Sequence, residues 1–173
     1  MKTLIPAILI LLSPLCSADE GAIESAKTHV NGSLKGNHKE LAATYAPKVT
    51  LMPGHEYLKE EYGLVGVGGR AKGAEVERDK LIAAMETAAA GQPASPAKQV
   101  NALLETLKYE VIKVEEGKVE VSPDPVGTPD VKFQFQVKKG DVLLKVSPPK
   151  GDFIFLHLRK IDGSWRIVSE YLD

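Results

Sequence analysis

Two titratable residues near the C-terminus, His157 and Glu170, are the clearest candidates for chemistry in the sequence. They lie on the last two predicted strands, which are joined by Asp162-Gly163, a dipeptide that favours a two-residue hairpin turn. In the register set by such a turn, Phe155 opposes Glu170, and His157 is a diagonal neighbour of Glu170 on the same face. We therefore expect the two side chains to lie within reach of each other.

Two roles are open for this pair. A carboxylate can hold an imidazole in one tautomer and raise its basicity, so the pair could act as a general acid and base. It could equally be a half-buried or interfacial ion pair, and structural pairs outnumber catalytic ones in proteins. The other histidines are His29, His38 and His55; none has metal-ligand spacing, and we expect no bound metal. We expect His29 on the outer side of the first helix.

The alternation of the last hairpin predicts two different faces. One is a plain core face directed at the helices: Ile154, Leu156, Leu158, Trp165, Ile167 and Tyr171. The other is aromatic near the open end and charged near the turn: Phe153, Phe155, His157, Arg159, Arg166, Val168 and Glu170. A mixed face of this kind can line a cavity or pack against a second subunit.

Residues 54–73 are rich in glycine and form the longest predicted connection. A phosphate-binding loop is not indicated, because Ala74 and Glu75 follow Gly73 where Lys and Ser or Thr would be needed. The remaining interpretations are a flexible connection and a lid over a pocket that is lined by Tyr57 and Tyr62.

Residues 1–18 have the order typical of a secretory signal. Lys2 precedes an apolar run, and the small residues Cys16, Ser17 and Ala18 follow it. The run is too short for a membrane span, which needs roughly 20 apolar residues. We expect cleavage after Ala18, a periplasmic or secreted location and no membrane association after removal of the signal.

The composition is that of an ordinary globular chain. Of its 173 residues, 43% are hydrophobic and 26% are charged. The 22 basic and 23 acidic residues form no basic stripe, so no nucleic-acid partner is expected. The single cysteine lies in the signal, and the mature chain would be stabilised by its core without a disulfide.

The periodicities predict helices first and strands last within one domain, residues 19–173 with an extended loop at 54–73. Helical spacing is found up to about residue 34, after Asn37, at 81–89 and at 100–107; strands are predicted at 49–52, 109–114, 118–122, 131–137, 142–146, 153–160 and 165–172. We expect hairpins that pair 109–114 with 118–122 and 131–137 with 142–146. This order indicates an α+β fold, with a curved antiparallel sheet around N-terminal helices.

Two stretches of the sequence resemble the nuclear transport factor 2-like superfamily, with its ketosteroid isomerase-like and SnoaL-like members. The strings GSLKGNHKELAATYAPKVTLMP and FIFLHLRKIDGSWRIVSEYLD are similar to its first helices and strand and to its last hairpin. Gly73 followed by the helix at 81–85 is similar to its third helix. The resemblance implies a cone-shaped, cystatin-like α+β roll with a pocket at its wide end, and commonly a homodimer through the sheet. The superfamily contains both enzymes and proteins without chemistry, so the fold does not decide the function.

Three functions fit these observations. The first is an exported protein that binds a small, partly hydrophobic ligand without a cofactor, in a pocket between helices and sheet. We expect that pocket to be lined by Tyr45, Met52, His55, Tyr57 and Phe155, together with His157 and Glu170. The second is a cofactor-independent isomerase, dehydratase or hydrolase that uses His157 and Glu170. The third is a dimeric interaction module, in which Phe153, Phe155 and Val168 are buried only on association.

Overall fold

The computed structural model describes residues 17–51, 70–71, 74–90, 95–112, 115–121, 132–151 and 153–172. These residues form helices and two sheets, and the predicted α+β class is confirmed. Within the described part of the chain, no helix has the length and apolar character needed to cross a membrane.

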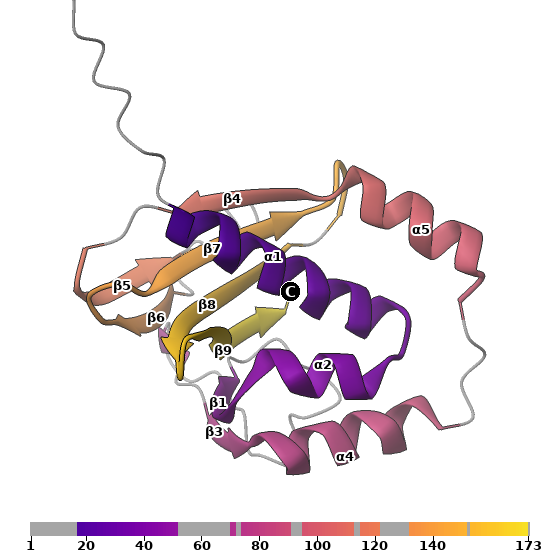
Figure 1. The fold of residues 1–173 in the computed structure, drawn as a ribbon, viewed down its shortest axis with the longest axis horizontal. Helices are drawn as coiled ribbons and strands as arrows, with labels where there is room; N and C mark the ends of the chain where they lie inside the picture. The colour runs from indigo at the N-terminus through magenta and orange to yellow at the C-terminus, as the bar shows by residue number, and fades with distance from the viewer. Residues whose placement is uncertain are drawn as a thin grey trace, which may run out of the picture.

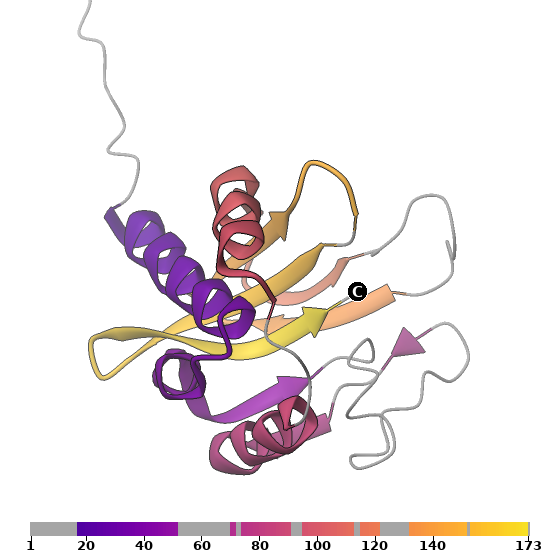
Figure 2. The ribbon, with the colours of Figure 1, turned by 90° about the vertical axis from the view of Figure 1, so that its right-hand side faces the viewer.

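The helices occur where the periodicity predicts them: α1 (Ser17–Leu34), α2 (His38–Thr44), α4 (Arg78–Ala89) and α5 (Ala97–Thr106). Asn37 caps α2 as expected, because its Oδ1 accepts a hydrogen bond of 3.2 Å from the backbone N–H of Glu40. The helix α1 runs across the larger sheet, and α5 lies beside it (Figures 1 and 2). These two helices lie on the same side of the larger sheet in both figures.

The larger sheet has the strand order β3-β1-β9-β8-β7-β4. Its strands are β1 (Tyr45–Leu51), β3 (Ala74–Glu77), β4 (Lys108–Ile112), β7 (Val142–Ser147), β8 (Ile154–Ile161) and β9 (Ser164–Leu172). Adjacent strands are antiparallel except β1 and β9, which are parallel. The sheet is therefore mixed, which differs from the antiparallel sheet that we expected.

A smaller sheet, in the order β2-β6-β5, corrects two of the predicted hairpins. Its strands are β2 (Arg70–Ala71), β5 (Gly117–Val121) and β6 (Lys132–Val137). The prediction that 109–114 pairs with 118–122 is wrong, since β4 pairs with β7 and β5 pairs with β6. The prediction that 131–137 pairs with 142–146 is wrong for the same reason. The chain changes sheets between β4 and β5 and again between β6 and β7, so sequence neighbours join different ladders.

The larger sheet separates two apolar clusters. The first, between the helices and the sheet, includes Ala26, Val30, Leu41, Leu144 and Leu156. The second, on the opposite face, consists of Phe135, Val137, Leu143, Phe155 and Tyr171. Because Phe135 and Val137 belong to β6, the smaller sheet covers the second cluster within one chain.

A β-bulge at Val168 decides which face carries each residue at the end of β9. From the turn onward the register is as predicted, with Leu158 opposite Ile167. Val168 is then an extra residue, and His157 pairs with Ser169 and Phe155 with Tyr171. The expected pairing of Phe155 with Glu170 is therefore wrong. One added residue in a strand reverses the face of every residue after it, so Glu170 faces the helices and Tyr171 faces the second cluster.

Candidate functional site

A cavity of about 190 Å³ lies between α1, α5 and strands β7 to β9. Its walls are mainly apolar, and they are formed by Val30, Leu34, Leu103, Leu107, Val146, Pro148 and Ile154. Polar groups come from Ser33 and from two buried residues, His29 and Glu170. Leu103, with 38% of its surface exposed, lies at the rim. The cavity thus combines apolar walls with one titratable edge.

Four buried side chains form a hydrogen-bonded chain at that edge. His29 Nε2 lies 3.1 Å from Glu170 Oε1, and His29 Nδ1 lies 2.9 Å from Thr44 Oγ1. The hydroxyl of Tyr45 donates to Glu170 Oε2. All four side chains are at most 4% exposed. A carboxylate and an imidazole so well shielded from water interact much more strongly than a surface pair does.

Four elements, α1, α2, β1 and β9, bring these groups together. His29 comes from α1, and Thr44 and Tyr45 come from the junction of α2 and β1. The rings of His29 and Tyr45 pack nearly at right angles, with the ring centroids 4.9 Å apart. Glu170 reaches the group only because the bulge at Val168 turns it toward the helices. The geometry therefore depends on a local irregularity in β9.

A second buried histidine pairs with a different carboxylate on the opposite face of the sheet. His157 Nε2 lies 2.8 Å from Asp141 Oδ2, and Arg159 donates two hydrogen bonds to the same carboxylate, at 2.9 and 2.7 Å. The backbone N–H of Lys138 also donates to Asp141 Oδ2. Asp141 lies where the chain passes from β6 to β7, so this cluster fixes the corner between the two sheets.

The pKa values of this cluster are shifted by burial and by its hydrogen bonds. Burial by itself would raise the pKa of Asp141, but the bonds from Arg159, Lys138 and His157 outweigh it and lower that pKa. Burial lowers the pKa of His157, and the bond and charge of Asp141 offset only part of this effect. In the part of the chain that is described, no hydrogen-bond partner of the buried His157 Nδ1 is found.

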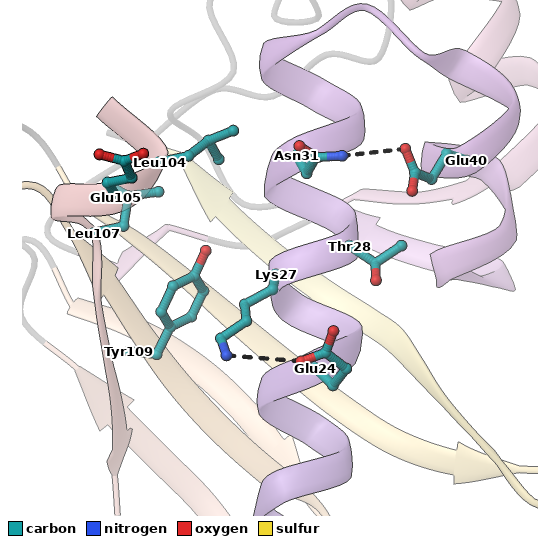
Figure 3. Close-up of a pocket in the computed structure, with 9 residues that line it drawn as sticks. All are labelled: Glu24, Lys27, Thr28, Asn31, Glu40, Leu104, Glu105, Leu107 and Tyr109. Atoms are coloured by element: carbon teal, nitrogen blue, oxygen red, sulfur yellow. Dashed lines mark hydrogen bonds and ion pairs between the residues drawn. The ribbon is translucent and has the colours of Figure 1, made fainter. Parts of the chain in front are cut away.

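Two further hollows are more polar. One, of about 500 Å³, lies on the far face of the larger sheet, and His157 and Arg159 are among its lining residues. The other, of about 560 Å³, is the groove between α1 and α5 in Figure 3, where Tyr109 and Lys27 point into the space between the helices. Burial, aided by the charge of Glu24, raises the pKa of Tyr109 to about 12. Every residue that lines this groove is at least partly exposed, so the ion pair between Lys27 and Glu24 is a surface pair of small energetic value.

Three solved structures to which this chain is similar are of proteins described as having unknown function. An NTF2-like protein of unknown function from Silicibacter pomeroyi is 18% identical, and the match covers 90% of this chain and 93% of that chain with a TM-score of 0.44. An NTF2-like protein of unknown function from Shewanella baltica is 15% identical, with coverages of 90% and 91% and a TM-score of 0.43. A cystatin-like protein of unknown function from Nostoc punctiforme is 12% identical, with coverages of 89% and 88% and a TM-score of 0.41.

Two of these proteins are described as NTF2-like, and the sequence resembles the same nuclear transport factor 2-like superfamily. No protein-family model and no curated protein matches the chain. The likeness concerns the fold alone, so the site has to be interpreted from its own residues.

The structure divides the expected site residues between the two faces. Tyr45 and Glu170 lie together on the helix side, whereas Phe155 and His157 lie on the opposite side. The expected contact between His157 and Glu170 is therefore wrong, and each of the two has another partner. Met52, His55 and Tyr57 lie outside the described residues, as does Tyr62 of the expected lid.

The expectation that Phe155 is buried only on association is also wrong. Phe155 is 4% exposed in the single chain, where it packs against Phe135 and Tyr171. A homodimer through the larger sheet would have to use surface outside this cluster.

Sequence reasoning missed two of the central residues, His29 and Asp141. The expected outward position of His29 is wrong, since the residue is 2% exposed. Its spacing carried the signal: His29 follows the fully buried Ala22 and Ala26 by seven and three positions, which is one helical face. Asp141 gave no local signal, because its side-chain partners, His157 and Arg159, lie on a strand that is 16 to 18 residues further along the chain.

Proposed function

We propose that this chain is an exported protein that binds a small, partly hydrophobic molecule in the cavity between α1, α5 and the larger sheet, without a cofactor. The observation that carries the proposal is a mainly apolar cavity with a buried polar edge, His29 and Glu170. Binding sites for small molecules commonly have this composition, with few polar groups that orient the ligand. Export rests on the order of residues 1–18 and is proposed with it.

The size of the cavity limits the ligand. A dry cavity of about 150 Å³ is known to hold benzene in another protein, so about 190 Å³ suits a single substituted ring. A probe of this size is 4-methylphenol, whose ring fits the apolar walls and whose hydroxyl can face the polar edge. At an intermediate efficiency per atom, such a probe binds with roughly 4 kcal/mol, which is a Kd of about 1 mM.

The test is a titration of the purified protein with 4-methylphenol, followed by NMR of the methyl groups of Val30, Leu34, Val146 and Ile154. We expect saturable shifts at these methyls. Leu103→Trp places a large ring at the rim of the cavity and should weaken binding by about tenfold or more, which is 1.4 kcal/mol or more.

The matched control is Ala102→Trp, an exposed position next to Leu103 on α5 that lies outside the cavity. It should bind like the unmodified protein. Absence of saturable shifts, or equal weakening by both tryptophans, would contradict binding in this cavity.

The buried acid and base favour a second candidate, a cofactor-independent enzyme of the isomerase, dehydratase or hydrolase kind. The acid–base pair would be His29 with Glu170, in place of His157 with Glu170, because only the former pair lines one cavity at hydrogen-bond distance. 4-Methylphenol cannot be isomerised, dehydrated or hydrolysed, so turnover is tested with a reactive compound of similar size, phenyl acetate, whose hydrolysis to phenol and acetate should be lost in Glu170→Gln. Binding without such change leaves the first candidate.

A further inference from the structure

The hydroxyl group of Thr44 lies between a backbone carbonyl and the His29 ring. Thr44 Oγ1 is 2.7 Å from the carbonyl oxygen of Leu41 and 2.9 Å from His29 Nδ1. A carbonyl oxygen can only accept, so Thr44 must donate its one hydroxyl hydrogen to Leu41. At its other contact the Thr44 oxygen therefore accepts, and His29 Nδ1 must carry a hydrogen and donate it.

This assignment restricts the other side of the ring. With a hydrogen on Nδ1, the contact of 3.1 Å between His29 Nε2 and Glu170 Oε1 needs one further hydrogen between the two atoms. That hydrogen belongs either to an imidazolium beside a carboxylate or to a carboxylic acid beside a neutral imidazole. A neutral imidazole beside a carboxylate would set two lone pairs against each other. Tyr45 donates to the second oxygen, Oε2, so the shared hydrogen lies on the Oε1 side.

We propose that Thr44 is a positioning residue of the cavity site: it holds His29 with Nδ1 protonated, so that His29 and Glu170 keep one shared proton at the edge of the cavity. The inference deepens the proposed function, because it states the protonation of the edge that a ligand meets. The pair has no net charge in either of its two states. Its proton can move between Nε2 and Oε1 without placing an uncompensated charge in the core.

The chain contains a matched control for the local structure. Thr44 is the last residue of α2 and bonds to the carbonyl three residues earlier. Thr106 is the last residue of α5 and makes the same bond to Leu103, also at 2.7 Å, but it is exposed and this bond involves no histidine. Thr106→Val therefore removes the same bond at a helix end without removing a contact of His29 or Glu170.

The experiment is NMR of the purified protein labelled with ¹⁵N-histidine, in which long-range ¹H–¹⁵N correlations distinguish protonated from unprotonated ring nitrogens. In the unmodified protein, His29 Nδ1 should be protonated. Thr44→Val removes the acceptor at nearly constant volume, and Nδ1 should then lose its proton while Nε2 keeps one. Thr44→Ser should restore the original pattern, and Thr106→Val should leave it unchanged.

An unprotonated Nδ1 in the unmodified protein would overturn the proposal, whether or not Thr44→Val folds. An unchanged pattern in folded Thr44→Val would overturn it as well. The titration with 4-methylphenol separates this result from the proposed function. If the His29 pattern is as expected but no probe binds, the ligand-binding function fails and the role of Thr44 stands; if the probe binds and the pattern does not depend on Thr44, the reverse holds.

Discussion

At the scale of single residues, the molecule contains two buried histidine–carboxylate pairs with different surroundings. His29 and Glu170 border a mainly apolar cavity, and their partners are the hydroxyls of Thr44 and Tyr45. His157 and Asp141 instead share their carboxylate with the Arg159 guanidinium. The cation keeps Asp141 ionised, so His157 Nε2 donates to it and the second pair has a structural role at the corner between the sheets.

The lowered pKa of His157 predicts how stability depends on pH. Its ordinary value is 6.5, and burial places the pKa of the folded state below this value. Between the two values the unfolded chain binds a proton that the folded chain does not, so stability falls as the pH decreases from 6.5 toward the folded-state pKa. His157→Gln keeps a donor for Asp141 and removes the titration, and the loss of stability in this window should become smaller.

Urea unfolding at a series of pH values measures this effect. The control is Ser169→Ala, which changes the residue paired with His157 on β9 but removes no titrating group and should keep the original slope. An identical pH dependence in His157→Gln and in the unmodified protein would show that His157 does not contribute.

At the scale of elements, the bulge in β9 decides the composition of both cores. Deleting Val168 would remove the unpaired residue, and the ladder could then continue regularly with His157 still opposite Ser169 and Leu156 still opposite Glu170. Glu170 would therefore stay on the helix side, within reach of His29. Breaking a buried ionic pair typically costs about 3–5 kcal/mol. We expect the deletion to lower the free energy of unfolding by less than about 3 kcal/mol, measured by urea unfolding, because it keeps this pair.

Val168→Ala keeps the number of residues in β9 and serves as the control. It should also lose little stability, because Val168 is only partly buried and the bulge is retained. A deletion variant that is less stable than Val168→Ala by about 3 kcal/mol or more would mean that the bulge itself is needed to hold Glu170 beside His29.

The same bulge explains why the sequence predicts the hairpin but not its far end. Asp162 and Gly163 adopt positive φ values of 49° and 78°, as the predicted two-residue turn requires, and the register near the turn is correct. Beyond Val168, the register with the bulge and the register without it both place Glu170 on one face of the sheet and Tyr171 on the other. The alternation of residue types therefore cannot reveal the bulge, and the site prediction failed at this point.

The strand partners illustrate a different limit. Periodicity locates β4, β5, β6 and β7 along the chain, because it depends on local spacing. Their pairing depends on contacts across the molecule, such as the bonds from Arg159 and His157 that hold Asp141 at the corner. Local spacing carries no information about these contacts. We assumed that successive strands pair, and this assumption predicted two hairpins that do not form.

At the scale of the whole molecule, one sheet supports two cores and the candidate site lies on one side only. The helices close the face that carries Glu170, and the smaller sheet closes the face that carries Phe155. Leu103 is the only large hydrophobic side chain that is exposed among the described residues, and it lies at the rim of the cavity. The exposed side chain of Leu103 is therefore at the proposed ligand entrance.

The proposed cleavage after Ala18 makes a prediction about the whole fold, because α1 already begins at Ser17. A chain that starts at Asp19 keeps Gly21, where an added Cβ would lie 3.0 Å from the Trp165 ring, and keeps the bond from Ser25 Oγ to the Trp165 carbonyl oxygen. It also keeps Ala22 and Ala26, which are fully buried. We expect residues 19–173 to unfold at the same temperature as the full chain, and mass spectrometry of the exported protein to find Asp19 at its N-terminus.

A chain that starts at Lys27 is the comparison that shows what α1 contributes. It lacks both buried alanines and the contacts of Gly21 and Ser25 with Trp165, so α1 loses the turns that pack against β9. Its thermal unfolding should occur at a clearly lower temperature or without cooperativity. The reason is that the apolar side chains of the sheet are buried only while the helices cover them. If residues 19–173 were as unstable as this shorter chain, the segment before Asp19 would belong to the folded domain, and its proposed removal on export would be wrong.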